Sequence, residues 1–194
     1  MDPMMGPRMR LVMPVDELVE LATLTMGDAP VLARLVRDNV TRLSPWLPFA
    51  TPAYDEPAAR GYIQQCAADW ASGRGTALGI WVNGTLSGSI GVHAINWVEG
   101  HGSIGYWIAS EGEGRGLVTR SAARLLYWMF DEVGLERAEI RAAVDNRKSR
   151  QVAERLGFQM EGVARHGAEV AGRWLDMAVY GLLRSEWRVR IANT

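Results

Sequence analysis

The segment Ser110-Glu111-Gly112-Glu113-Gly114-Arg115-Gly116-Leu117-Val118-Thr119 places three alternating glycines directly before a helical pattern. Because glycine has no Cβ atom, backbone amides in such a loop can approach a ligand closely. The helix that follows adds unpaired N–H groups and a partial positive charge at its first turn, where Thr119 supplies a hydroxyl. The segment therefore predicts a loop that binds phosphate oxygens.

The residues that follow the glycines predict a helix over about 115–132. Its apolar residues recur at spacings of three and four and form one face: Val118, Ala122, Leu125, Leu126, Met129 and Val133. Strand patterns at about 102–109 and 138–144 flank the loop and the helix. A crossover of this kind is normally parallel and right-handed, which places the glycine loop at the carboxyl end of the first strand, where ligands bind in open α/β sheets.

The remainder of the chain alternates strand and helix patterns, without a repeat or an interdomain linker. Two prolines exclude a regular helix over 43–49, so this segment is predicted to be a structured loop. The turn dipeptide Asn83-Gly84 predicts a hairpin between strands at 78–82 and 87–94. The other predicted elements are a strand at 18–24, a helix from the capping residue Asp28 to about 39, helices at 56–72 and 148–156, and strands at 158–164 and 174–183 that are joined by a loop at 165–173.

A chain of 194 residues has the size of one domain, predicted to span 15–188 between a lead-in at 1–14 and a tail at 189–194. The first ten residues are expected to be disordered. Lys and Arg total 21 against 22 Asp and Glu, so the net charge is -1 and no basic field exists for nucleic acid or an anionic membrane. Without a signal-peptide pattern or a long apolar run, and with Cys66 as the single cysteine, the chain is predicted to be cytoplasmic and free of internal disulfides.

Other phosphate-binding loops fit the glycine segment less well. No Lys-Ser/Thr pair follows the glycines, as a P-loop requires, and G-x-G-x-G differs from the dinucleotide pattern G-x-G-x-x-G. A dinucleotide loop also normally follows the first strand of its unit, whereas this loop lies past the middle of the chain. A glycine-rich turn that only reverses the chain is the remaining alternative.

In its motifs the chain resembles the GNAT superfamily of acyl-CoA N-acyltransferases, and within it the RimJ/RimL-like branch of ribosomal-protein N-terminal acetyltransferases. The family signature, Gln/Arg-x-x-Gly-x-Gly/Ala at a helix start, is filled by 111–116 with one departure, the acidic Glu111 at the first position. Its carboxylate is unfavourable beside a pyrophosphate unless it points away. The resemblance spans about 18–187 and includes Trp46-Leu47-Pro48, Ile104-Gly105-Tyr106-Trp107-Ile108 and the segment from Asn146 to Phe158.

The resemblance implies a single α/β (α+β) domain, with a mixed, mostly antiparallel sheet splayed between its fourth and fifth strands and helices on both faces. It implies acetyl-CoA as co-substrate, no metal, and direct attack of an amine on the thioester without an enzyme nucleophile. Backbone N–H groups along the fourth strand, near 107–109, would stabilise the oxyanion. The implied cofactor-binding residues are Trp107, Ile108, Ala109, Glu113, Gly114, Arg115, Gly116, Leu117, Val118, Thr119, Asn146, Ser149 and Arg150.

Asn146 and Ser149 stand three residues apart at the start of a predicted helix, which by itself is an ordinary helix cap. The resemblance implies that the asparagine contacts the pantetheine arm and that the serine protonates the departing thiolate, directly or through water. Arg147, Lys148 and Arg150 form a basic cluster that fits either the CoA phosphates or a solvated helix face.

An amine must lose its proton before it attacks, so a base or a water chain is useful. Glu169, in the predicted loop between the last two strands, is the candidate that the resemblance places in the acceptor region. His93, on a central strand, competes with it. A solvated carboxylate and a core histidine are the alternative interpretations. His166 is expected at the surface, and Asp176 fits either an anchor for a cationic acceptor or a structural hydrogen-bond network.

Four aromatic residues, Trp46, Phe49, Tyr54 and Trp97, are expected either at the acceptor wall or in the core. The acceptor stays open between a protein N-terminus, a polyamine, an antibiotic and another small amine. The sequence also admits a succinyl donor and a homo-oligomer. The competing function is a degenerate domain that only senses acyl-CoA, which the three glycines, Asn146 and Ser149 disfavour.

Overall fold

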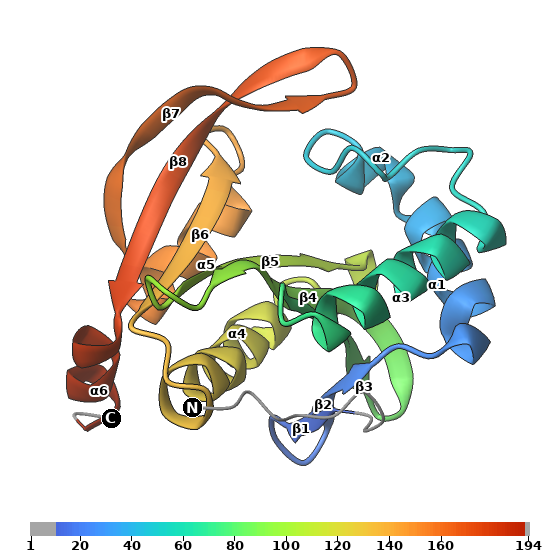
Figure 1. The fold of residues 1–194 in the computed structure, drawn as a ribbon. Coiled ribbons are helices and arrows are strands. Elements are labelled where there is room, and N and C mark those ends of the chain that lie inside the picture. Colours follow the sequence, from blue (N-terminus) through green and yellow to red (C-terminus); the bar gives the residue numbers. More distant parts are fainter. Residues whose placement is uncertain (1–10, 193–194) are drawn as a thin grey trace.

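Alternating apolar residues pair into one mixed sheet, with its strands in the order β1-β2-β3-β4-β5-β6-β8-β7 (Figure 1). The computed structural model describes residues 11–192, so the expected disorder of the first ten residues lies outside the described part. The strands are β1 Val12–Pro14, β2 Val19–Thr23, β3 Thr76–Val82, β4 Thr85–Asn96, β5 His101–Ile108, β6 Arg137–Ala143, β7 Gln159–Val170 and β8 Arg173–Leu183.

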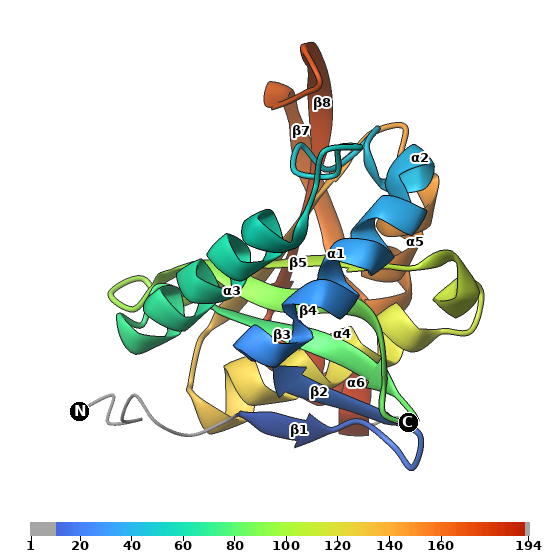
Figure 2. The ribbon, with the colours of Figure 1, turned by 90° about the vertical axis from the view of Figure 1, so that its right-hand side faces the viewer.

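Helices cover both faces of the N-terminal part of the sheet, with α1 and α3 on one face and α4 on the other (Figures 1 and 2). Prolines stand in the first turn of α1 and of α3, where no intrahelical N–H is needed, and Asp55 caps α3 by accepting a hydrogen bond from Ala58 N. The helices are α1 Ala29–Asp38, α2 Val40–Leu43, α3 Glu56–Ala71, α4 Leu117–Tyr127, α5 Arg147–Leu156 and α6 Arg184–Ala192.

The two faces hold separate apolar cores. The apolar face of α4 packs against inward side chains of the central strands in the larger core, where Leu125, Leu126 and Ile90 are at most 1% exposed. A smaller core lies under α1 and α3 and includes Leu32 and Trp107. Neighbouring residues of β5 therefore face different cores, which gives each side of this strand its own chemistry.

The sheet opens between β5 and β6, the two parallel strands. Their pairing runs only from His101 with Arg137 to Ile104 with Ile140. Beyond that point β5 continues along β4 as far as Ile108, and β6 continues along β8. This is the expected splay between the fourth and fifth strands of the family pattern, which are β5 and β6 here because β1 precedes them.

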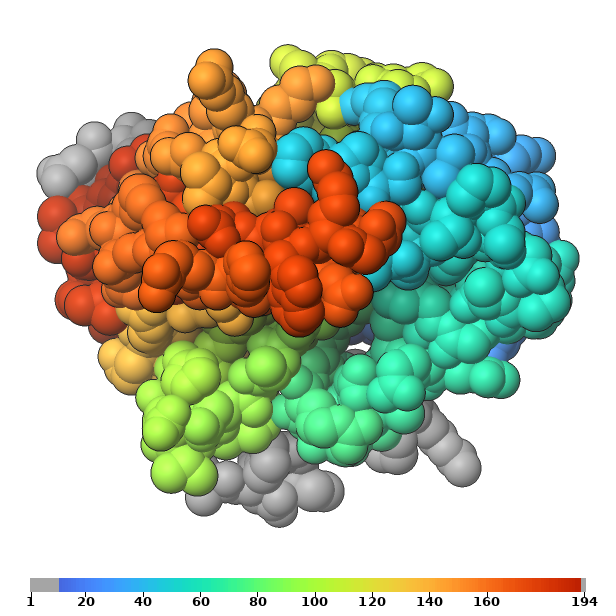
Figure 3. All heavy atoms as spheres, turned by 90° about the horizontal axis from the view of Figure 1, so that it is seen from above, coloured from blue at the N-terminus to red at the C-terminus, as the bar shows by residue number. Residues whose placement is uncertain are grey.

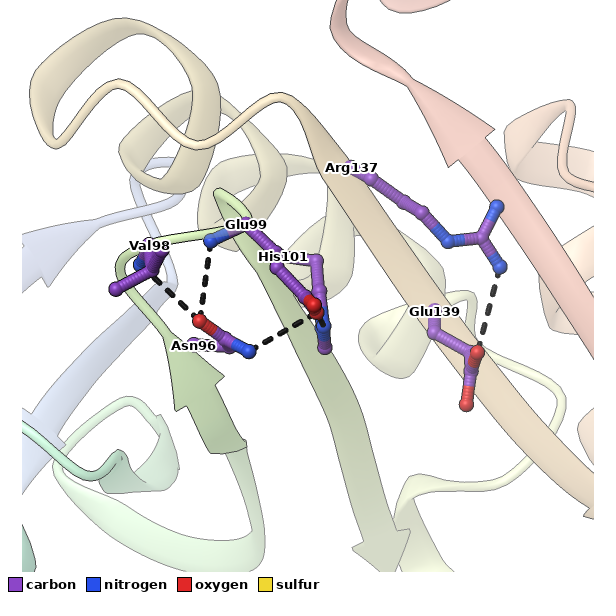
Figure 4. A network of polar contacts seen from close by, with 6 residues as sticks. All are labelled: Asn96, Val98, Glu99, His101, Arg137 and Glu139. Atoms are coloured by element: carbon purple, nitrogen blue, oxygen red, sulfur yellow. Dashed lines mark hydrogen bonds and ion pairs between the residues drawn. The ribbon is translucent and has the colours of Figure 1, made fainter.

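Polar contacts hold the closed end of this split (Figure 4). Asn96 Oδ1 accepts two backbone hydrogen bonds within the β4–β5 turn, at 3.0 Å each. Glu99 Oε2 lies 3.0 Å from both Asn96 Nδ2 and His101 Nε2. On the neighbouring strand, Arg137 Nη2 donates to Glu139 Oε2 at 3.3 Å. Between the two strands, Glu136 N and Arg137 N donate to Gly100 O at 2.7 and 3.1 Å, so β5 and β6 are joined at this end and diverge at the other.

Most predicted elements are confirmed, and one is wrong. The segment 165–173, expected to be a loop, belongs to a long hairpin in which β7 runs to Val170 and β8 begins at Arg173. The turn needs only two residues, Ala171 and Gly172, both with positive φ, and the remaining irregularity is a break in the strand register between Ala164 and Ala168. β1 and α6 were not predicted, and they lie in or reach into the segments that the sequence assigned to the lead-in and the tail.

Candidate functional site

The glycine loop turns sharply before α4 and leaves space in front of its backbone. Gly114 and Gly116 have φ of +71° and +70°, a conformation that residues with a Cβ rarely adopt. Apart from the chain neighbours, no described atom lies within 4 Å of where a Cβ would stand at either glycine. Gly116 is the N-cap of α4, so no side chain covers the N–H groups from Leu117 onward. This open, uncapped turn fits a pyrophosphate.

A buried asparagine anchors the start of the loop. Asn39, at the end of α1, is 4% exposed. Its Oδ1 accepts a hydrogen bond from Ser110 N at 2.8 Å, and its Nδ2 donates to Leu35 O at 2.9 Å. Ala109 N donates to Ser87 O at 2.8 Å and fixes the other side. Sequence reasoning missed Asn39, because its partner lies 71 residues away.

The two glutamates of the loop have different surroundings. Glu111, at the family's Gln/Arg position, is exposed, and hydrogen bonds from its own backbone N–H and from Ser110 lower the pKa of its carboxyl group. The carboxylate of Glu111 is therefore stabilised mainly within its own turn, with a smaller electrostatic contribution from Arg42. Glu113 instead forms ion pairs with Arg42 of α2 and with Lys148 of α5, the second at 2.7 Å. The Glu113 carboxylate thus links α2 and α5 at the glycine loop.

Asn146 and Ser149 lie where β6 ends and α5 begins. Asn146 Oδ1 accepts a hydrogen bond from Ser149 N at 3.2 Å, so Asn146 is the N-cap of α5. Tyr106 Oη lies 3.0 Å from both Ser149 O and Ser149 Oγ. This phenol spans the open part of the split, since Tyr106 belongs to β5 beyond the last paired residue.

Tyr106 keeps its proton over the ordinary pH range. Burial, chiefly, raises its pKa to about 12, while the hydrogen bond with Ser149 opposes that rise. A neutral phenol can donate one hydrogen bond and accept another, so it orients the Ser149 hydroxyl. The sequence offered Tyr106 only as part of a family segment, because its contact with Ser149 crosses 43 residues.

The basic residues near α5 are not equivalent. Arg150 donates to Tyr180 Oη at 2.9 Å and to Val144 O at 3.1 Å, so its guanidinium ties α5 to β8 and to the end of β6. Arg115, in the glycine loop, and Arg147 are exposed. Val118 and Thr119 lie half-buried in the first turn of α4. Direct contact of these residues with the cofactor stays a prediction.

Beyond the last pair with β6, β5 has backbone N–H groups on its open edge. Ala109 N is already bonded to Ser87 O of the β4 side. N–H groups alternate between the two edges of a strand, so Ile108 N points toward the open edge facing β6. Of the three residues predicted near the oxyanion, Ile108 is the one whose N–H faces the open edge, and its role stays a prediction.

The opposite side of β5 borders a small pocket. Trp107 is 8% exposed and lines a small, partly open pocket. The other lining residues come from α1, from the segment between α2 and α3, and from α3 itself: Leu32, Val36, Phe49, Tyr54 and Tyr62. Trp46 is half-buried nearby in sequence but does not line it. Trp97 donates to Gly73 O at 2.7 Å, beyond the C-terminal end of α3, and lies away from this wall.

The β7–β8 hairpin arches from the sheet toward α2 (Figure 1), and seen from above it crosses the molecule beside a hollow next to α3 (Figure 3). Glu169 lies on β7 rather than in a loop, paired with Trp174. Its neighbour Val170 is 2% exposed whereas Glu169 is exposed, so the carboxylate points away from the side that packs inward. The catalytic role of Glu169 stays a prediction.

Two other sequence candidates shape the same hairpin. His166 has a positive φ of +50° and stacks on Trp174, with 5.7 Å between ring centroids. Asp176 Oδ1 accepts a hydrogen bond from His166 N at 2.9 Å. Asp176 therefore supports a backbone irregularity in β7, which agrees with the structural interpretation of that residue.

Three polar side chains lie side by side across the central strands, on the face that α3 covers. His93 of β4 pairs with Ser103 of β5, and Ser103 pairs with Glu139 of β6, so the three side chains share one face. Burial against the sheet lowers the pKa of His93, and Asp69 of α3 opposes this with a smaller rise. His93 retains solvent access, so a neutral imidazole is available there. Sequence reasoning missed Glu139.

Cys66 has the character of a packed thiol. Burial, its largest influence, raises the pKa of the thiol to about 11, and Tyr62 next to it opposes the rise through a hydrogen bond. A thiol with so high a pKa carries little thiolate near neutrality. Within 11–192, no helix is long and apolar enough to cross a membrane, and no cluster of three or more His, Cys, Asp and Glu residues is arranged to hold a metal.

Comparisons with known proteins identify the family of the chain. Residues 19–159 match the family model described as Acetyltransferase (GNAT) domain. The chain is 40% identical over 177 residues to "Putative ribosomal N-acetyltransferase YdaF" of Bacillus subtilis (strain 168), covering 89% of this chain and 95% of that protein. It is 26% identical over 166 residues to the ribosomal-protein-serine acetyltransferase of Escherichia coli (strain K12), covering 86% and 93%.

The fold has solved counterparts as well. The structure of Mycobacterium smegmatis RimJ in complex with CoA-disulfide superposes with a TM-score of 0.85 at 25% identity, covering 96% of this chain and 95% of that one. The chain therefore belongs to the GNAT acetyltransferase family and is an acetyltransferase that takes its acetyl group from acetyl-CoA.

Proposed function

We propose that the enzyme transfers the acetyl group to a primary amine at a protein N-terminus, by direct attack of the amine on the thioester. The observation that supports transfer from the cofactor is the split between β5 and β6, with the open glycine loop at one end and the Tyr106–Ser149 pair across it. The names of two relatives point to ribosomal proteins as the acceptor class.

The phosphates of the cofactor bind at the glycine loop in this proposal, and the acyl arm runs through the split. Backbone amides from Gly114 to Thr119 hold the pyrophosphate, which explains why the acidic Glu111 is tolerated at the signature position. Ile108 N donates to the oxyanion as the carbonyl becomes tetrahedral. The amine nitrogen forms a bond to the carbonyl carbon, the carbon–sulfur bond breaks, and the sulfur leaves as a thiolate.

Ser149 assists the departure of the sulfur. Its hydroxyl, oriented by Tyr106, donates a hydrogen bond to the developing thiolate, while Asn146 holds the start of α5 in register. Neither side chain forms a bond to the acyl group. The high pKa of the Cys66 thiol supports a mechanism without a covalent acyl-enzyme.

His93 takes the proton from the amine in this proposal. The lowered pKa keeps its imidazole neutral near pH 7, and its side of the sheet is the side of the pocket and of α3. The sequence also offers Glu169 as a candidate base. It lies on β7, where its carboxylate points away from the side of the strand that packs inward. His93→Gln and Glu169→Gln form a matched pair: the variant that loses the acidic limb of the kcat/KM profile identifies the base.

The acceptor class is tested by incubating purified protein and acetyl-CoA with three sets of amines. These are peptides with free N-termini, the same peptides with blocked N-termini and free lysines, and polyamines. Mass spectrometry should find an added acetyl group only on free N-termini. Acetylation of polyamines alone would replace the protein acceptor with a small amine. Tight binding of acetyl-CoA without transfer to any set would favour the sensor module.

A further inference from the structure

We propose that Arg42 and Lys148 bind cofactor phosphate and that Glu113 occupies their binding position until the cofactor arrives. The idea rests on the proposed placement of the phosphates at the glycine loop. It adds two side-chain ligands to the backbone site, one from α2 and one from α5. It also makes these residues determinants of specificity, because they distinguish an acyl donor that carries phosphates from one that lacks them.

The contacts place both cations at the loop. Glu113 lies immediately before Gly114, whose backbone faces open space. One carboxylate oxygen pairs with Arg42 and the other lies 2.7 Å from Lys148 Nζ. Three side chains from three separate elements therefore meet beside the uncapped N-terminus of α4.

The charges do not balance at this point. Two cations and the partial positive charge of a helix N-terminus face the carboxylate of Glu113, and the Glu111 carboxylate acts on Arg42 only through a smaller electrostatic interaction. A carboxylate and a phosphate both accept hydrogen bonds from Arg and Lys, and Arg can bind either in a bidentate manner. Glu113 therefore presents the same acceptor chemistry as a phosphate, with fewer oxygens and less charge.

Exposure makes an exchange feasible. The side chain of Glu113 is 31% exposed, that of Arg42 is 34% and that of Lys148 is 78%. Ion pairs with this much solvent are weak, because water screens the charges and competes for them. A diphosphate offers more oxygens and at least twice the charge, so it displaces Glu113 from the cations. Arg42 is the less exposed of the two, so its contact contributes more than that of Lys148.

Calorimetric binding of CoA and of pantetheine, which lacks all phosphates, tests the idea. Arg42→Gln should weaken CoA binding about tenfold and Lys148→Gln about threefold, in line with charge-assisted bonds reduced by exposure. Neither variant should change pantetheine affinity. Glu113→Gln should tighten CoA binding about threefold, because the carboxylate no longer competes. Dephospho-CoA separates the phosphates: an unchanged effect assigns the pair to the pyrophosphate, and a lost effect assigns it to the 3′-phosphate.

Glu111→Gln and Arg34→Gln are the controls. Glu111 is the other acid of the loop, and Arg34 is an exposed arginine of α1. If Glu111→Gln tightens CoA binding as much as Glu113→Gln, a general charge effect replaces the proposal. Weaker CoA binding by Glu113→Gln at unchanged pantetheine affinity also overturns it, as do wild-type affinities in both cation variants. If Gly114→Asp leaves CoA binding intact, the loop placement itself is wrong, which is a separate failure.

Discussion

Removal of the Ser149 hydroxyl should slow acetyl transfer without loosening the cofactor. Two pKa values show whether the Tyr106 proton could pass, through Ser149, to the leaving thiolate. The pKa of Tyr106 is about 12, whereas that of a thiol is about 8.5. That gap of about 3.5 pH units corresponds to roughly 5 kcal/mol against full transfer of the phenolic proton. The pair therefore stabilises the thiolate through a hydrogen bond rather than by giving up its proton. A hydrogen bond to a charged group contributes about 1.5–3 kcal/mol, so Ser149→Ala should lower kcat roughly 10- to 150-fold.

A double-mutant cycle separates orientation from chemistry. Tyr106→Phe keeps the ring and removes only the hydroxyl that lies 3.0 Å from Ser149 Oγ. If Tyr106 acts by orienting Ser149, Tyr106→Phe should cost less than Ser149→Ala, and the double variant should be no slower than Ser149→Ala. Release of the CoA thiol under saturating acetyl-CoA gives kcat, and calorimetry gives CoA affinity. Wild-type kcat in Ser149→Ala, or additive losses in the double variant, would refute the mechanism.

Three further outcomes are expected. CoA should raise the thermal midpoint of the wild type, and Gly114→Asp should abolish this rise whereas Gly134→Asp should not; both glycines have positive φ and open space, but only Gly114 lies in the loop. His93→Gln should remove the acidic limb of kcat/KM, which in the wild type falls below the usual histidine range because the pKa is lowered; an unchanged limb would assign the base elsewhere. Asn39→Ala should cost about 1–3 kcal/mol of stability in denaturant unfolding and weaken CoA binding, whereas loss of stability alone would make Asn39 purely structural.

The sequence predicted what is local and periodic. The glycine loop, the helix behind it and the Asn83-Gly84 hairpin depend on neighbours in the chain, and each appears as expected. The Asn146 cap was likewise predictable, because Ser149 N is its partner three residues on. These features need no knowledge of which strands become neighbours.

Contacts between distant segments could not be predicted in the same way. The bonds from Asn39 to Ser110 and from Tyr106 to Ser149, and the row that joins His93 to Glu139, exist only once the strands are ordered. The error over 165–173 has a different cause. Glycines and charged residues in this stretch resemble a loop, but an edge hairpin that extends beyond the sheet exposes both faces and tolerates polar residues along its length.

Asn39 makes α1 common to the glycine loop and to the pocket beside Trp107, so in the proposed function this helix borders both substrates. Its carboxamide holds Ser110 at the head of the glycine loop, while Leu32 and Val36 of the same helix line the pocket beside Trp107. Ligand that steadies the loop therefore also steadies one wall of the pocket, and thermodynamic reciprocity requires the acceptor to strengthen cofactor binding by the same factor. The consequence is cooperative binding in which either substrate, whichever binds first, raises the affinity for the other.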